Sequence, residues 1–121
     1  MVNPNPVGLT GERLAKQFLT RNGYTIVTSN FATRAGEIDI IALKDRILLF
    51  VEVKARVGDA STRPYEAVTY IKRRHMRMAI AYFLTNKRYA AYKYAASVIS
   101  VVLTADLSLV SLKHYTDLQL T

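Results

Sequence analysis

Two strand-like runs, 36–43 and 47–54, flank the dipeptide Asp45-Arg46 and constrain the fold more than any other feature of the chain. If that dipeptide is the centre of a tight turn, alternation gives the hairpin two faces, and both are apolar near the turn. One face carries Ile38, Ile40, Ala42, Leu49, Val51 and Val53, and the other begins with Ile41, Leu43, Leu48 and Phe50. Because strands that are apolar on both faces are covered on both sides, we expect this hairpin in the middle of a sheet.

Charged residues gather at the open end of the hairpin, on the second of these faces. With a two-residue turn, Asp39 lies directly across from Glu52, with Cβ atoms about 4.5 to 5.5 Å apart. Glu37 then lies across from Lys54. Neighbouring carboxylates repel each other, and a carboxylate withdrawn from water is costly unless something neutralises it. A divalent cation that prefers oxygen ligands, Mg²⁺ or Mn²⁺, would do so.

Two alternatives stay open for this hairpin. Glu37 and Lys54 can form a simple cross-strand salt bridge, while Asp39 and Glu52 sit at a solvated sheet edge. A three-residue loop with a bulge would also shift the register by one residue, although residues on one strand would keep their shared face.

The remaining pattern predicts two helices and three further strands. We expect the first helix over 11–22, with Thr10 as N-cap, and the second from Pro64 or Thr69 to Phe83. The apolar stripe predicted for the second helix consists of Val68, Ile71, His75, Met78, Ala79, Tyr82 and Phe83. Strands are expected over 24–31, 96–103 and 107–115. The order α-β-β-β-α-β-β predicts one α/β domain over residues 1–121, a mixed sheet flanked by helices, with a flexible segment 1–7.

Composition excludes several classes of protein. The chain has no cysteine, so disulfides, thiolate metal sites and thiol nucleophiles are absent. No apolar run approaches the roughly 18 residues that span a bilayer, and no secretory signal is visible, so we expect no membrane partner and a cytoplasmic location.

The charge balance favours a nucleic-acid partner, since 17 Lys and Arg side chains stand against 9 Asp and Glu, a formal net charge of +8. Lys72, Arg73 and Arg77 lie away from the apolar stripe of the second helix and suit phosphate contacts. Arg56 lies near the expected cleft and is a weaker candidate. The alternative for these residues is a solvated helix face.

The segments Gly36-Glu37-Ile38-Asp39 and Phe50-Val51-Glu52-Val53-Lys54 resemble the Asp and Glu-x-Lys signature of the PD-(D/E)xK nuclease superfamily, whose fold is restriction-endonuclease-like. More narrowly, the chain resembles the YraN-like family of predicted bacterial endonucleases. Four blocks carry this resemblance over roughly residues 8 to 85: residues 11–15 with Gly23-Tyr24, 36–41, 50–56, and 66–69 with Lys72 and Arg73.

The resemblance implies roles for individual residues. Asp39 and Glu52 would be the metal-binding carboxylates and Lys54 the catalytic lysine. Glu12 would match the acid that the first helix supplies in related archaeal Holliday-junction resolvases; a solvated acid in the first helical turn is an equally good interpretation. The implied activity is Mg²⁺- or Mn²⁺-dependent hydrolysis of phosphodiester bonds in DNA, with branched or flapped DNA as candidate substrates, and a homodimer is compatible with it.

Two other functions remain open from the sequence. One is a non-catalytic nucleic-acid-binding module that keeps the nuclease fold, since fold does not fix function. The other is a protein-interaction domain whose basic surface meets an acidic partner. The intact set of Asp39, Glu52 and Lys54 favours the enzyme, because a binding module has no need of costly paired acids.

Overall fold

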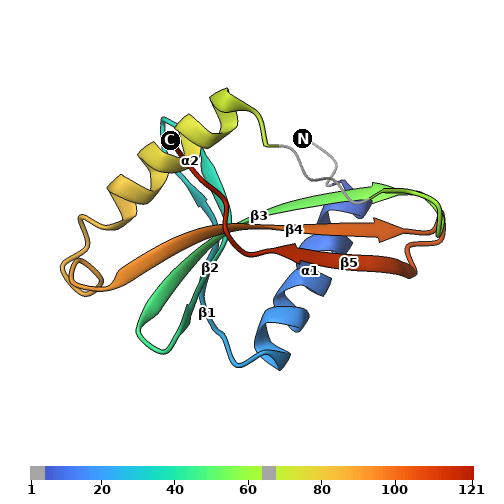
Figure 1. The fold of residues 1–121 in the computed structure, drawn as a ribbon, viewed down its shortest axis with the longest axis horizontal. Coiled ribbons are helices and arrows are strands. Elements are labelled where there is room, and N and C mark those ends of the chain that lie inside the picture. The colour runs from blue at the N-terminus through green and yellow to red at the C-terminus, as the bar shows by residue number, and fades with distance from the viewer. Residues whose placement is uncertain (1–4, 64–67) are drawn as a thin grey trace.

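A computed structural model describes residues 5–63 and 68–121. Its elements are α1 (Pro6–Arg21), β1 (Thr25–Ala32), β2 (Glu37–Lys44), β3 (Ile47–Val57), α2 (Tyr70–Phe83), β4 (Lys93–Leu103) and β5 (Leu109–Tyr115). The strands form one five-stranded sheet in the order β1-β2-β3-β4-β5. β3 and β4 are parallel and the other neighbours antiparallel. This confirms the predicted α/β class and element order (Figure 1).

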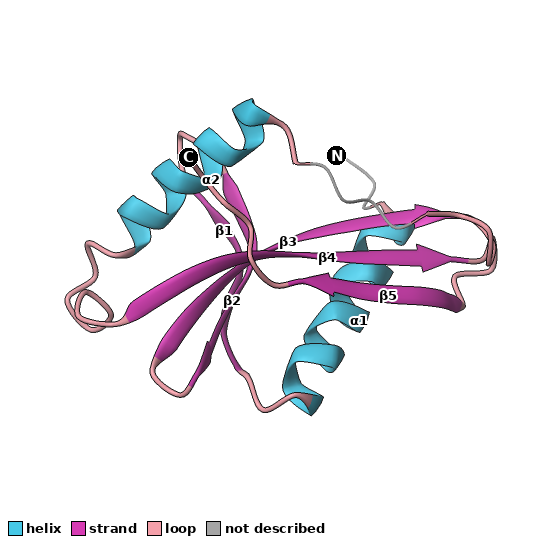
Figure 2. Ribbon diagram, viewed as in Figure 1, coloured by secondary structure: helices cyan, strands magenta, loops and turns pink. Residues whose placement is uncertain are grey.

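The two helices cover opposite faces of the sheet (Figure 2). Ala15 and Leu19 of α1 belong to one hydrophobic cluster, whereas Met76 and Phe83 of α2 belong to the other. Strands β2 and β3 contribute side chains to both clusters, as expected of a central hairpin. No helix in the described part of the chain is long and apolar enough to cross a membrane.

The hairpin turn has the predicted two-residue form. Asp45 and Arg46 both have positive φ, +52° and +63°, which matches the twist of a two-residue hairpin connection. Pairing then runs outward from Lys44↔Ile47 to Ile40↔Val51 without a shift. The bulged three-residue alternative is therefore wrong.

Helix α1 begins earlier than its sequence pattern indicates. Asn5, not Thr10, is the N-cap, and its side chain accepts a hydrogen bond from the Val7 N–H at 3.1 Å. Pro6 occupies the first turn, where its missing N–H costs nothing. Of the segment 1–7 that was expected to be flexible, Pro6 and Val7 are helical, and residues 1–4 lie outside the described residues.

The face assignment of Ile38 is wrong. Ile38 belongs to the cluster beneath α2, whereas Ile40 belongs to the cluster beneath α1. Strict alternation would put both side chains on one face. Asn30 of β1, next to this position, has a φ of +53°, and β1 and β2 keep their pairing on both sides of it, Ser29↔Ile40 and Phe31↔Ile38. Between Ile38 and Ile40, therefore, the face of the sheet to which each side chain points is exchanged in both paired strands.

Helix α2 is capped by Thr69, whose Oγ1 accepts the Lys72 N–H at 3.1 Å. This resolves the choice of start in favour of Thr69; Pro64 lies outside the described residues. The predicted stripe is right for Val68, Ala79 and Phe83, which are buried, but wrong by about one position for Ile71, His75, Met78 and Tyr82. The buried side chains are Met76, Ala79, Ile80 and Phe83, while Ile71, Met78 and Tyr82 are exposed. One position corresponds to a rotation of about 100°, and it turns Lys72 toward the sheet.

The last two strands also differ from expectation at their starts. β4 begins at Lys93 instead of Ala96, and β5 begins at Leu109 instead of Leu107. Leu107 has a φ of +69° and donates its N–H to Thr104 O at 2.9 Å, so it belongs to the preceding turn.

Candidate functional site

Strands β2 and β3 part at Asp39. The backbone pairing of β2 and β3 ends at Ile40↔Val51. Beyond this pair the Asp39 side chain replaces the backbone as hydrogen-bond acceptor, and its Oδ2 accepts the Val53 N–H at 2.8 Å. The carboxylate therefore lies between the strands. Asp39 and Glu52 are not a ladder pair, but their carboxyl groups interact directly.

Glu52 is the buried acid of the site, with a residue exposure of only 5%. Lys54 Nζ lies 3.8 Å from Oε1, and Lys72 Nζ lies 3.3 Å from Oε2. Oε2 is fully shielded and has no hydrogen-bond donor in good geometry among the described residues. Two lysines from different elements thus flank one carboxylate whose hydrogen-bonding capacity is not filled.

Burial governs the electrostatics of both acids. It raises the pKa of Glu52 to about 7, helped by the negative charge of Asp39 and opposed by Lys72 and Lys54. Burial also raises the pKa of Asp39, against the Val53 hydrogen bond and the charge of Lys72. Both acids resist ionisation because the surrounding positive charge does not fully compensate them.

Glu12 reaches the same region from α1. It lines a cavity of about 500 Å³ whose walls are Asn5, Gly8, Leu9, Glu12, Glu37, Asp39, Val53 and Ala55. Because α1 begins at Pro6, Glu12 is not in the first turn, and its side chain is only 15% exposed. The interpretation as a solvated first-turn acid is therefore wrong. Glu12 Oε1 instead accepts Asn30 Nδ2 at 3.0 Å and pairs with Lys16 Nζ at 3.2 Å, and its charge raises the pKa of Asp39.

The predicted acids therefore converge on the parting of β2 and β3. Asp39 lies at its centre, Glu52 lies toward α2, and Glu12 and the exposed Glu37 lie on the α1 side. Gly11 brings α1 close to β3, since a Cβ on it would lie 2.4 Å from Ala55 Cβ. That close approach holds Glu12 over the site.

Asp39 and Glu52 fit a hard divalent cation. Mg²⁺ commonly keeps several waters and binds through one or two protein carboxylates, and Glu52 Oε2, which has an ion-pair partner in Lys72 but no hydrogen bond among the described residues, is an oxygen ligand of the required kind. Among residues 5–63 and 68–121, no group of three His, Asp or Glu side chains is arranged to hold a metal ion. The chain can thus offer a two-carboxylate site that water or a substrate phosphate would complete.

The predicted nucleic-acid-binding residues have different environments. Arg56 and Arg73 each have a buried Nε without a hydrogen-bond partner in the described structure, so both keep an unused donor. Arg77 Nη1 donates to Leu120 O at 2.7 Å, which ties α2 to the C-terminal segment. Lys72 is part of the acid site itself.

Sequence reasoning missed the place of Lys72 and the part of Asn30. Lys72 precedes Met76 by four positions and so shares its buried face; that spacing was the available signal. Asn30 orients Glu12, and only the fold brings these residues together across 18 positions of sequence.

The fold and site define a small mixed α/β domain whose central hairpin holds two interacting acids, one of them between two lysines. The chain belongs to the uncharacterised protein family UPF0102, whose family model matches residues 11–103.

Several relatives of similar length are similar to this chain in sequence. A UPF0102 protein of Clostridium perfringens is 39% identical over 111 residues, covering 92% of this chain and 91% of the relative. One from Caldicellulosiruptor bescii is 43% identical over 83 residues, covering 69% and 70%. One from Chlorobium phaeobacteroides is 33% identical over 119 residues, covering 95% and 94%.

Proposed function

We propose that this protein is a metal-dependent endonuclease that hydrolyses phosphodiester bonds of DNA, within the PD-(D/E)xK superfamily. The observation that carries the proposal is the acid pair at the parting of β2 and β3. Asp39 and Glu52 interact directly, burial raises the pKa of both carboxyl groups, and two lysines approach Glu52. Such pairs are costly to keep in a fold and cluster at functional sites.

Each side chain of the site has a role in this proposal. Asp39 and Glu52 would hold Mg²⁺ or Mn²⁺, which when bound neutralises phosphate charge and assists the leaving oxygen. Lys54 orients the attacking water and stabilises the charge that develops on the phosphate. Glu12, over the same cavity as Asp39, orients water on the α1 side.

A non-catalytic nucleic-acid-binding module is the second candidate. The net charge of +8 favours phosphate binding with or without cleavage. The acid pair favours the enzyme, since carboxylates repel a phosphate backbone unless a cation intervenes. A cytoplasmic location and a homodimer remain predictions of the sequence.

A cleavage panel tests the proposal. Labelled single-stranded, duplex, flap and four-way-junction DNA would be incubated with the protein in Mg²⁺ or Mn²⁺. We expect cleavage of at least one substrate, its loss in chelator, and its loss in Asp39→Asn. Asp117→Asn, the same change at an exposed acid of the C-terminal segment, is the matched control and should cleave normally. Binding of these substrates without cleavage in either metal would support the binding module instead.

A further inference from the structure

Helix α2 carries a second apolar stripe that the domain leaves in solvent. Tyr70 is 66% exposed, Ile71 64% and Tyr82 64%, and Met78 between them is also exposed. The core is already covered by the neighbouring stripe that contains Met76 and Phe83. Contiguous exposed apolar side chains of this size mark interaction sites.

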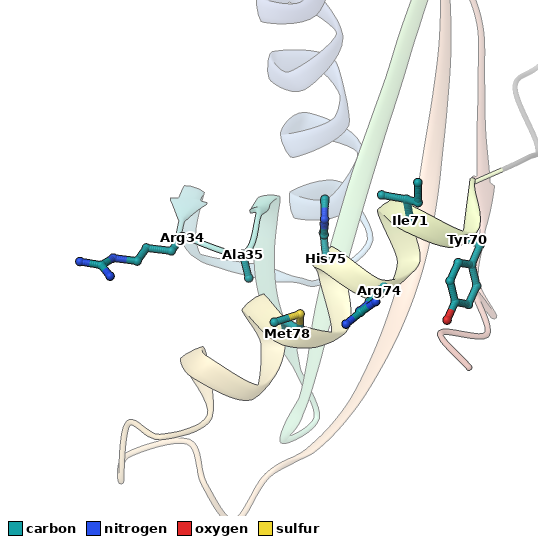
Figure 3. A pocket seen from close by; sticks show the side chains of 7 residues that line it. All are labelled: Arg34, Ala35, Tyr70, Ile71, Arg74, His75 and Met78. Carbon is teal, nitrogen blue, oxygen red and sulfur yellow. The ribbon is translucent and has the colours of Figure 1, made fainter.

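This stripe forms one wall of a groove, and the β1–β2 loop forms the other (Figure 3). Two adjoining hollows of about 360 and 710 Å³ share Arg34, Ala35 and Met78. The loop lies tightly against the helix, because a Cβ on Gly36 would lie 2.8 Å from His75 Cβ. Volumes of about 300 to 1,000 Å³ are typical of ligand sites.

The charge on the groove is positive. Arg34 and Arg74 line it, and Arg34 extends outward from the loop in Figure 3. Residues 70–83 contain Lys72, Arg73, Arg74 and Arg77 and no acid. The occupant must therefore offer negative charge together with apolar faces. A second copy of this chain would bring like charges together, and duplex DNA hides the faces of its bases. Single-stranded nucleic acid offers phosphates and open bases at once.

We propose that this groove binds the unpaired bases of a single-stranded nucleic acid, with Tyr70, Ile71 and Tyr82 as the stacking surface and Arg34 and Arg74 at the phosphates. Helix α2 connects the groove with the acid site, because Ile71 lines the groove and the next residue, Lys72, pairs with Glu52 at 3.3 Å. Resting on the proposed nuclease function, this placement makes the substrate a nucleic acid with a single-stranded segment beside the cleaved bond.

Binding can be measured without cleavage. Fluorescence anisotropy of a labelled thymidine oligomer would be compared with that of a fully paired hairpin of equal phosphate number, in chelator, with the metal-free protein. We expect tighter binding of the single strand. Tyr70→Ala should weaken single-strand binding by at least about fivefold, the lower end of the effect of losing one stacked base. Tyr70→Phe keeps the ring and should restore most of the affinity.

Matched changes elsewhere separate the groove from general effects. Leu109→Ala removes an exposed apolar side chain on β5 and should leave the affinity unchanged. Arg74→Ala should make the salt dependence shallower by about 0.7 in log–log slope, one phosphate contact on a single strand. Arg21→Ala, at the exposed end of α1, removes the same charge and should not change it. The side chains of the four substituted residues are all exposed: Tyr70, Leu109, Arg74 and Arg21. We therefore expect the circular dichroism spectrum of each variant to match that of the wild type, and this is checked.

Three outcomes overturn the proposal. The first is equal affinity for single strand and duplex. The second is an affinity for the single strand that Tyr70→Ala leaves unchanged. The third is a dimer in sedimentation velocity that Met78→Glu dissociates while single-strand binding is unaffected, which would make the groove an interface between copies. Failure of cleavage alone would refute the proposed nuclease and leave these binding results standing.

Discussion

Glu52→Gln should stabilise the metal-free protein at alkaline pH. The folded structure raises the pKa of Glu52 from an ordinary value of 4.5 to about 7. Between these values the folded state holds a proton that the unfolded chain has released. The free energy of unfolding of the wild type therefore falls as pH rises through this window, and the loss is complete above about pH 7.

The magnitude follows from the size of the pKa difference. One pKa unit corresponds to about 1.4 kcal/mol, so ionising Glu52 costs the folded state up to about 3 kcal/mol. That figure already contains the attraction of Lys54 and Lys72, which lower the pKa. Glutamine keeps the shape of the side chain and cannot ionise, so the variant avoids this cost.

Urea unfolding in chelator at pH 4.5, 6 and 8 provides the assay. We expect the two proteins to agree at pH 4.5 and the variant to be more stable by on the order of 2 kcal/mol at pH 8. Glu37→Gln removes the same charge from an exposed position of β2 and serves as control. A variant that is less stable at pH 8, or a difference that does not change with pH, would refute the reasoning that the buried carboxylate is electrostatically uncompensated.

Three further outcomes are expected. Lys54→Ala should abolish single-turnover cleavage of a flap substrate while binding in Ca²⁺ stays nearly intact, because a group that acts in the transition state adds little to ground-state affinity; a parallel loss of binding would contradict this. Gly11→Val should lower the free energy of unfolding by roughly 2 to 3 kcal/mol, since a Cβ there lies 2.4 Å from Ala55 Cβ. The control Gly8→Val places a Cβ in ordinary contact at 3.7 Å and should lower the free energy of unfolding much less. Thr69→Ala should lower the free energy of unfolding by about 1 kcal/mol, because α2 loses its N-cap. The melting midpoint should fall accordingly, and an unchanged midpoint would show that the cap contributes nothing.

Local patterns were sufficient to predict the central hairpin. Alternation of apolar side chains and a dipeptide between two strand-like runs determined the turn at Asp45-Arg46 and the pairing out to Ile40↔Val51. They also placed Glu52 and Lys54 on one face, where their ion pair lies. These are short-range consequences of strand geometry, so one sequence suffices to predict them.

The sequence-based predictions were wrong where two local patterns are equally good and only tertiary contacts decide which one is buried. Helix α2 has two adjacent stripes that are both largely apolar, one starting at Ile71 and one at Lys72. Periodicity favours the first, but the structure buries the second, because Met76 packs into the core while Lys72 reaches Glu52. The exchange of faces in β2 at Asp39 likewise depends on the positive φ of Asn30 in the neighbouring strand. No pattern within β2 reveals that backbone conformation.

Binding of Mn²⁺ to the metal-free protein tests the central claim most directly, with free Mn²⁺ followed by electron paramagnetic resonance. We predict that the wild type binds Mn²⁺, that Mg²⁺ competes for the same site, and that Lys54→Ala retains binding. Asp39→Asn, which keeps an oxygen acceptor for the Val53 N–H, should lose it. Equal Mn²⁺ binding by Asp39→Asn and wild type would contradict the claim that the acid pair of β2 and β3 is a metal site.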